Sequence, residues 1–233
     1  MLLAIDTATR YASVALYDEG GVRAEYTWRA ERNHTVELLP AIAGMLAQQK
    51  RAPADLLGVA VAGGPGSFTG LRIGMSAAKG LCLALGLPII AIPTLDVITY
   101  AVGDPGGPVY AVLEAGRGRI SVAAYTFEDG LPVQQGDLLL ELERAWAPPA
   151  DEPVLVAGEI SATLADHLLA LPQADNIAIT SLAGSLRRAG YLAELAWERL
   201  QSGRTDDLAT LSPIYGFPPL SGTAEADPRA APA

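Results

Sequence analysis

The sequence is poor in the residues that build metal sites and disulfides. Its 233 residues include one cysteine, Cys82, and two histidines, His34 and His167, which lie far apart along the chain. A single cysteine excludes an internal disulfide and favours a reducing, cytoplasmic compartment. Histidine ligands of a transition metal commonly lie three or four residues apart on one helix face, so we expect no metal site.

Positive charge and long apolar runs are scarce as well. The chain carries 16 Lys and Arg against 26 Asp and Glu, a net charge of −10, so it lacks the basic surface with which a protein holds nucleic acid by itself. No apolar run reaches the roughly 18 residues of a membrane span, and we expect no secretory signal, because a strand pattern begins at the first residue. With 50% hydrophobic residues, the chain should be globular, with a sizeable core and no membrane partner.

Residues 59–86 predict a strand, a glycine turn and a helix. The turn places three glycines around Pro65, and the helix that follows has Ser67 or Thr69 as its N-cap and ends at Gly86. Small residues recur along one face of this helix: Gly70, Gly74, Ala77 and Ala84. We expect this face to let another backbone approach closely.

The glycine turn has two interpretations. Free N–H groups at a helix N-terminus could cradle a phosphate, or the glycines could make a tight turn with close helix packing. The pattern favours the tight turn, because neither G-x-x-x-x-G-K-[ST] nor G-x-G-x-x-G is present and Thr69 stands in place of the third glycine. The candidate phosphate or nucleotide contacts are Asp6, Thr7, Gly64, Gly66 and Ser67.

Several candidate chemical groups also have a structural interpretation. Asp6, at the end of the first strand, could bind Mg²⁺ beside a phosphate or make an Asx turn. His34 could be a general base, but no nucleophile or orienting carboxylate lies beside it, which favours an exposed or interface position at a helix N-terminus. Ser67 lacks the Gly-x-Ser-x-Gly elbow of a nucleophile, and Cys82 lies among apolar residues, as core cysteines do.

Hydrophobic patterning predicts the order βββαβαβ in the first half of the chain. The expected strands are 1–5, 12–17, 22–29, 57–62 and 88–92, and the expected helices are 33–50 and the one after the glycine turn. Pro40 either kinks the first helix or means that its regular part starts later.

The same order begins again after a linker at 103–108. The expected strands are 109–113, 120–126, 131–140, 154–157 and 177–179, with a short helix at 142–146, a helix at 161–171 and an amphipathic helix at 182–200. We therefore expect a first domain at 1–103, completed by the C-terminal helix at 182–203. A second, degenerate domain would span 104–181, and a disordered tail 216–233.

A duplicated βββαβα unit resembles the actin, hexokinase and Hsp70 superfamily, in which two ribonuclease-H-like α/β domains with mixed sheets flank a nucleotide cleft. The resemblance is specific at four stretches: Leu-Ala-Ile-Asp-Thr-Ala-Thr (3–9), His-Thr-Val-Glu-Leu-Leu-Pro (34–40), Gly-Pro-Gly-Ser-Phe-Thr-Gly-Leu-Arg-Ile-Gly (64–74) and Ile-Pro-Thr-Leu (92–95). Together they are similar to the bacterial TsaB family, formerly YeaZ. The resemblance implies a non-catalytic scaffold for TsaD, the enzyme that places threonylcarbamoyl on the adenosine beside the anticodon of ANN-decoding tRNAs.

The chain departs from the catalytic and nucleotide-binding members at several motifs. TsaD-type enzymes carry a metal-binding His-x-x-x-His pair where residues 90–97 here contain no histidine. The superfamily's Asp-x-Gly-Thr phosphate turn reads Asp-Thr-Ala-Thr at 6–9, and its adenosine-binding turn keeps only Gly158. The family's Asp-Ala-Arg and Tyr-Leu-Arg motifs read Glu-Ala-Gly-Arg at 114–117 and Tyr-Gly-Phe at 215–217. We therefore expect no cofactor in the isolated chain, with ATP or ADP only at a junction with partner subunits.

The resemblance also implies a partner surface. Family members use the helix at 33–50 and the helix after the glycine turn both to pair with themselves and to pair with TsaD, so we expect a homodimer from which TsaD displaces one copy. The expected contact residues are His34, Glu37, Leu38, Ile42, Met45, Gly70, Arg72, Gly74, Ala77 and Ala78. A TsaE-type ATPase would be a further partner, and tRNA would be held only through the complex.

Three alternatives from other classes stay open. An ATPase or sugar-kinase-like enzyme would need tight nucleotide binding by the isolated chain. A glycoprotease-like peptidase would need a metal or a nucleophile, which the sequence does not show. A self-associating dimer would have no partner enzyme.

Overall fold

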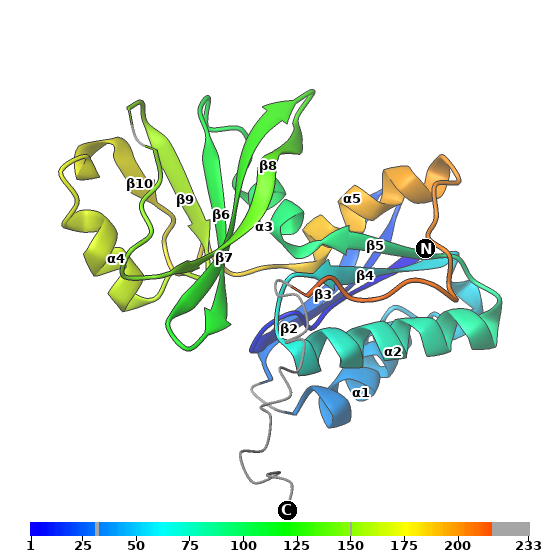
Figure 1. The fold of residues 1–233 in the computed structure, drawn as a ribbon. Helices are drawn as coiled ribbons and strands as arrows, with labels where there is room; N and C mark the ends of the chain where they lie inside the picture. The colour runs from blue at the N-terminus through cyan, green and yellow to red at the C-terminus, as the bar shows by residue number, and fades with distance from the viewer. Residues whose placement is uncertain (31–32, 150, 216–233) are drawn as a thin grey trace, which may run out of the picture.

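Two five-stranded mixed sheets, each flanked by helices, form the protein (Figure 1). The computed structural model describes residues 1–30, 33–149 and 151–215, and the expected tail at 216–233 lies outside them. The predicted α/β class, with a duplicated order of elements, is confirmed. Within the described ranges, none of the helices is long and apolar enough to cross a membrane.

The first sheet has the strand order β3-β2-β1-β4-β5. Its strands are β1 (Leu2–Asp6), β2 (Tyr11–Asp18), β3 (Gly21–Arg29), β4 (Gly58–Gly64) and β5 (Ile89–Pro93). β1 pairs antiparallel with β2 and parallel with β4, and every residue of β1 and β4 is buried. Both strands are mostly apolar because helices cover both faces of the sheet.

Three helices surround this sheet: α1 (His34–Gln48), α2 (Phe68–Leu85) and α5 (Ala189–Gln201). α1 and α2 lie side by side on one face, and α5 lies on the other (Figure 1). Leu38 and Met45 of α1 and Met75 of α2 pack with Leu3 and Ile5 of β1. α1 continues through Pro40, which lies inside the helix.

The second sheet has the order β10-β9-β6-β7-β8. Its strands are β6 (Val109–Gly116), β7 (Arg119–Glu128), β8 (Leu131–Leu142), β9 (Val154–Gly158) and β10 (Ile177–Ile179). The remaining helices of the described chain are α3 (Thr94–Val102) and α4 (Ala162–Leu169), with the short 3-10 helices η1 (Pro53–Asp55) and η2 (Ala174–Asn176). Leu95 and Ile98 of α3 pack against Leu113 and Tyr125 of this sheet. Because α3 also contacts α5 and the first sheet, it forms an apolar joint between the two halves of the molecule.

Three expected elements differ from the structure. Residues 94–102 form α3, which was not predicted, because several β-branched residues in so short a segment give little helical signal. The helix expected at 142–146 is wrong: β8 continues to Leu142, and one hydrogen-bonded turn then brings Trp146 into the core. The last helix begins at Ala189, because the preceding residues form a turn and then cross to the first sheet.

The small face of α2 packs against the turn that follows β1. A Cβ at Gly70 would overlap the carbonyl oxygen of Thr7, and a Cβ at Gly74 would overlap the Thr7 hydroxyl. Thr7 Oγ1 donates a hydrogen bond of 2.7 Å to the carbonyl oxygen of Gly70. The backbone that approaches this face is therefore the chain's own.

We predict opposite effects of alanine at two glycines of α2. Gly70→Ala should lower the free energy of unfolding by about 1–3 kcal/mol, because the added methyl group meets rigid backbone. Gly80→Ala should raise it by about 0.5–1 kcal/mol, because nothing lies within 4 Å of the added Cβ and alanine is the better helix former. Urea denaturation measures both. Equal effects of the two substitutions would contradict the packing of α2 on the turn.

Asp96 of α3 lies half-buried beside the second sheet. Tyr125 Oη donates to Asp96 Oδ1 at 2.8 Å. Burial raises the pKa of the Asp96 carboxyl, and the hydrogen bond from Tyr125 only partly opposes this. The folded state therefore favours the protonated carboxyl. This contribution to stability is complete below the unfolded pKa and is lost as the pH rises through the higher folded pKa.

Asp96→Asn should consequently stabilise the protein at pH 7 and lose that advantage in acid. Asparagine keeps an acceptor for the Tyr125 hydroxyl and carries no charge to desolvate. The difference in melting temperature between variant and wild type should shrink as the pH falls toward about 4, the ordinary range of an aspartate. Asp175→Asn, which removes an exposed charge, controls for net charge. A difference in melting temperature that grows as the pH falls would show that the charged form of Asp96 is the stabilising one.

Candidate functional site

The turn after β1 uses its polar groups internally. Asp6 Oδ1 accepts a hydrogen bond of 2.8 Å from the Ala8 N–H, as in an Asx turn. Thr7 donates to α2, as described above, and the carbonyl oxygen of Thr9 accepts from His34 Nε2 at 2.9 Å. Asp6 and Thr7 are almost completely buried. Neither of these two candidate phosphate contacts presents a free oxygen or hydroxyl to a ligand.

The other oxygen of Asp6 is paired with a guanidinium. Arg187 Nε donates to Asp6 Oδ2 at 3.0 Å, and Arg187 Nη2 donates to Thr9 Oγ1 at 2.6 Å. Arg187 Nη1 lies 3.5 Å from Glu159 Oε1, which follows β9 of the second sheet. Burial by itself lowers the pKa of Arg187, but the two carboxylates outweigh it and the pKa lies above the ordinary arginine value. Sequence reasoning missed Arg187, because no local motif marks it and its partner is 181 residues away.

The glycine turn has the geometry of close packing. The Ser67 N–H donates to the carbonyl oxygen of Ala8 at 2.6 Å, and the Ser67 hydroxyl accepts from the Gly70 N–H at 3.3 Å as the cap of α2. A Cβ at Gly66 would overlap the carbonyl oxygen of Ala8, and a Cβ at Gly64 would overlap that of Ile214. Backbone atoms of the chain itself therefore fill the space beside the glycine turn that a bound phosphate would need.

A cavity of about 1130 Å³ lies between the two sheets. The β1–β2 turn and the N-terminus of α2 form one wall, and the β6–β7 loop with the end of β8 forms the other. The charged residues that line it are Arg10, Arg72, Glu114, Arg117, Arg119 and Glu159. Arg10 and Glu114 form an exposed ion pair across its mouth. The departure from the family motif at 114–117 thus lies on this cavity, which the candidate phosphate contacts Gly66 and Ser67 also line.

A nucleotide with a metal ion does not fit the turn after β1. The carboxylate that would hold the cation is neutralised by Arg187, and the neighbouring hydroxyl and N–H groups have partners within the chain. Within the described ranges, no three His, Cys, Asp or Glu side chains are placed to hold a metal ion. The two carboxylates that line the cavity beside the turn, Glu114 and Glu159, are each paired with an arginine.

An aromatic cluster stands at the N-terminus of α2. The rings of Phe68 and Tyr215 lie 5.0 Å apart, and the Arg72 guanidinium lies 4.1 Å from the centre of the Phe68 ring. Arg72 Nε donates to the Tyr215 hydroxyl at 2.9 Å. The segment before Tyr215 is fixed by the Ile214 N–H, which donates to the carbonyl oxygen of Gly63 at 2.7 Å. Tyr215 therefore ties the end of the described chain to the glycine turn.

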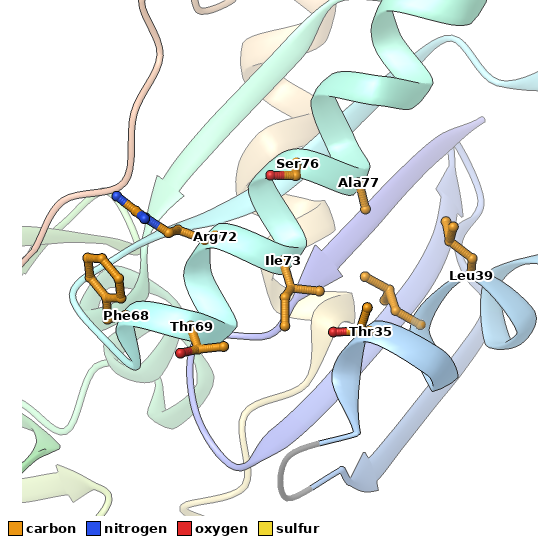
Figure 2. Close-up of a pocket in the computed structure, with 9 residues that line it drawn as sticks. Thr35, Leu39, Phe68, Thr69, Arg72, Ile73, Ser76 and Ala77 are labelled. Atoms are coloured by element: carbon orange, nitrogen blue, oxygen red, sulfur yellow. The ribbon is translucent and has the colours of Figure 1, made fainter.

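A groove of about 610 Å³ runs between the outer sides of α1 and α2. Figure 2 shows Ile73 and Ala77 of α2 pointing toward α1, with Thr35 and Leu39 across the groove. Leu39 is 53% exposed and Phe68 is 54% exposed. The groove is thus an apolar surface that the described part of the chain leaves open.

The structure divides the expected contact residues between the core and this surface. The buried residues are His34, Leu38, Ile42, Met45, Gly70, Gly74 and Ala78. Arg72 is exposed, and Glu37, which accepts from Trp28 Nε1 at 2.8 Å, is partly exposed, as is Ala77. Most of these buried residues pack inward, on the core of the first sheet and on the turn after β1, so Glu37, Arg72 and Ala77 are the expected contacts that reach the surface. Residues 35, 39, 68, 69, 73 and 76, which were not predicted, line the groove together with the expected residues Leu38, Arg72 and Ala77.

His34 and Cys82 are structural in this arrangement. His34 was expected in an exposed or interface position, but it is only 5% exposed, because its ring holds the start of α1 on the turn after β1. Cys82 is 1% exposed, as expected for a core residue, and burial raises the pKa of its thiol to about 11. Neither side chain is available for chemistry at the surface.

Residues 11–153 match a family model, TsaD, described as tRNA N6-adenosine threonylcarbamoyltransferase. The chain is 34% identical over 160 residues to the tRNA threonylcarbamoyladenosine biosynthesis protein TsaB of Bacillus subtilis, an alignment that covers 67% of this chain and 70% of that protein. It is 38% identical over 126 residues to TsaB of Escherichia coli, covering 53% of this chain and 54% of that protein.

Solved structures show the same fold over almost the whole chain. YeaZ from Pseudomonas aeruginosa superposes with a TM-score of 0.76 at 25% identity, covering 92% of this chain and 98% of that one. A protein described as uncharacterized, with similarity to peptidase YeaZ from Pseudomonas aeruginosa, superposes with a TM-score of 0.78 at 27% identity, with the same coverage.

Proposed function

This chain belongs to the TsaB (YeaZ) family of the actin-like ATPase superfamily, and from that membership we propose that it is a non-catalytic subunit in the synthesis of threonylcarbamoyladenosine in tRNA. In this role it binds and supports a TsaD-type catalytic subunit. The observation that carries the non-catalytic assignment is the ion pair between Asp6 and Arg187. The one carboxylate at the position expected for a metal ion is paired with an arginine of the same chain. The turn after β1 therefore has no free carboxylate for a metal ion that would carry a phosphate.

The groove between α1 and α2 is the docking surface in this proposal. Exposed apolar residues that gather over two helices commonly mark a protein interface. The family model that matches this chain is that of TsaD itself, so a TsaD-type subunit contains a domain of related fold with equivalent helices. A second copy of this chain and a TsaD-type domain could therefore meet the same surface in similar ways. Because one surface cannot hold both, the catalytic subunit replaces one copy of the homodimer.

Because the chain is strongly acidic, its partners bind the RNA in this proposal. A net charge of −10 repels a polyanion, so tRNA is held by the catalytic subunit and other members of the complex. ATP or ADP would be bound at the junction between subunits, and a TsaE-type ATPase would join there. The role of this chain is then to order the catalytic subunit by contact.

Leu39→Arg should weaken binding of a TsaD-type subunit at least tenfold, which corresponds to about 1.4 kcal/mol. Leu39 lies on the groove and its side chain is largely exposed, so the substitution should leave the fold intact while placing a charge in the interface. Isothermal titration calorimetry with the purified catalytic subunit measures the affinity. Sedimentation of the isolated variant should show a monomer where the wild type is a dimer.

Leu57→Arg is the matched control. Leu57 is 55% exposed, against 53% for Leu39, and it lies outside the groove. This variant should bind with wild-type affinity and support the same rate of threonylcarbamoyladenosine formation in a reconstituted reaction. A folded Leu39→Arg variant with unchanged affinity would place the docking surface elsewhere. Product formation by this chain without any TsaD-type subunit would overturn the non-catalytic role.

A further inference from the structure

Three oxygens converge on the guanidinium of Arg187. They belong to Asp6, Thr9 and Glu159, and each lies within 3.5 Å of a different guanidinium nitrogen. The Arg187 side chain is only 4% exposed and that of Asp6 only 1%. Carboxylate and hydroxyl oxygens gathered in this way are also the ligands that a hard divalent cation prefers. The guanidinium therefore occupies a position built for a cation.

Two of these oxygens and the arginine itself are fixed to the first sheet. Asp6 and Thr9 belong to β1 and its turn. The residues after Arg187 are held on β2 and β3, because the Ala189 N–H donates to Ser13 Oγ at 2.8 Å and the Gly190 N–H donates to Glu25 Oε1 at 2.7 Å. Arg187, Asp6 and Thr9 are consequently all anchored to the first sheet.

Glu159 belongs to the second sheet. It directly follows β9, and its N–H donates to the carbonyl oxygen of Val112 in β6 at 2.9 Å. The contact between Arg187 and Glu159 therefore joins the two sheets at the cavity between them, which Glu159 lines. The Arg10–Glu114 pair crosses the same cavity at its exposed mouth, where ion pairs contribute little.

We propose that Arg187 is an internal cation that takes the place of a divalent metal ion at the cavity between the two sheets and holds the sheets in one fixed arrangement. An arginine is charged at every physiological pH and cannot dissociate from the chain. Its removal would leave the carboxylates of Asp6 and Glu159 facing each other without compensation. The apolar contacts of α3 join the two halves of the molecule, and the Arg187 guanidinium limits how far the cavity between the two sheets can open. The arrangement of the sheets then does not respond to nucleotide.

Glu159→Gln tests the coupling without disturbing the first sheet. The substitution removes the charge on the second sheet but keeps Asp6 and Thr9 bound to Arg187. Spin labels at Ala47→Cys and Asp175→Cys, both exposed, report the distance between the two halves. Labelled chain is diluted with unlabelled chain to suppress distances between protomers. Cys82 stays unlabelled because it is buried and its thiol pKa is about 11.

Wild type should give one narrow distance distribution that is unchanged by Mg²⁺–ADP, and Glu159→Gln should add a longer, broader component. Glu128→Gln, an exposed charge of the second sheet, should leave the distribution as in wild type. An unchanged distribution in Glu159→Gln would overturn the proposal. A shift of the wild-type distance on addition of Mg²⁺–ADP would overturn it equally, because the cleft would then respond to nucleotide.

Chemical rescue identifies the cation position. Arg187→Ala should broaden the distance distribution and lower the melting temperature, and millimolar methylguanidinium should partly restore both. The same addition should have no effect on wild type, and it should not narrow the distance distribution of Arg187→Ala combined with Glu159→Gln, which lacks the carboxylate of the second sheet. Absence of rescue in a folded Arg187→Ala variant would contradict the assignment. If that variant does not fold, the Glu159→Gln measurement decides alone.

Discussion

Asp6 carries a negative charge at the end of the central strand, and the surrounding structure depends on keeping that charge paired. A buried carboxylate without partners costs several kcal/mol, because water no longer solvates it. Its two oxygens are bound by the Ala8 N–H and by Arg187. Since Arg187 enters from the segment between the second sheet and α5, this segment is fixed to the end of β1 at this point.

The same turn determines how close α2 can lie. The Thr7 hydroxyl and the carbonyl oxygen of Ala8 have partners at the start of α2, Gly70 and Ser67, and the carbonyl oxygen of Thr9 has His34 at the start of α1. These contacts require α2 to rest directly on the turn, which glycine permits and larger residues would prevent. The turn at 6–9, which departs from the superfamily's phosphate motif, is thus part of a network of hydrogen bonds within the chain. A bound phosphate would have to displace bonds that the fold itself uses.

The sequence predicted local features well and long-range ones poorly. The βββαβα order of the first half followed from hydrophobic period and turn residues, which act over a few positions. Gly70 and Gly74 of α2 were correctly predicted to allow close packing. What lay against that face could not be read from the chain, because Thr7 is 63 residues from Gly70. The pairing of Asp6 with Arg187 could not be predicted for the same reason, because the two residues are 181 positions apart. α3 was missed because its role is tertiary: it fills the joint between the sheets, and its own residues favour a helix only weakly.

The two sides of α1 show why an interface is hard to assign from sequence. Leu38 and Leu39 are adjacent, chemically identical and both on an apolar helix, yet one is 1% exposed and the other 53% exposed. A helix of 3.6 residues per turn places neighbours about 100° apart, so a wide apolar surface can cover a sheet and still extend beyond it. The inner residues are committed to the core of the first sheet and cannot serve a partner. The outer residues, such as Leu39 and Ile73, can contact another protein without disturbing the fold.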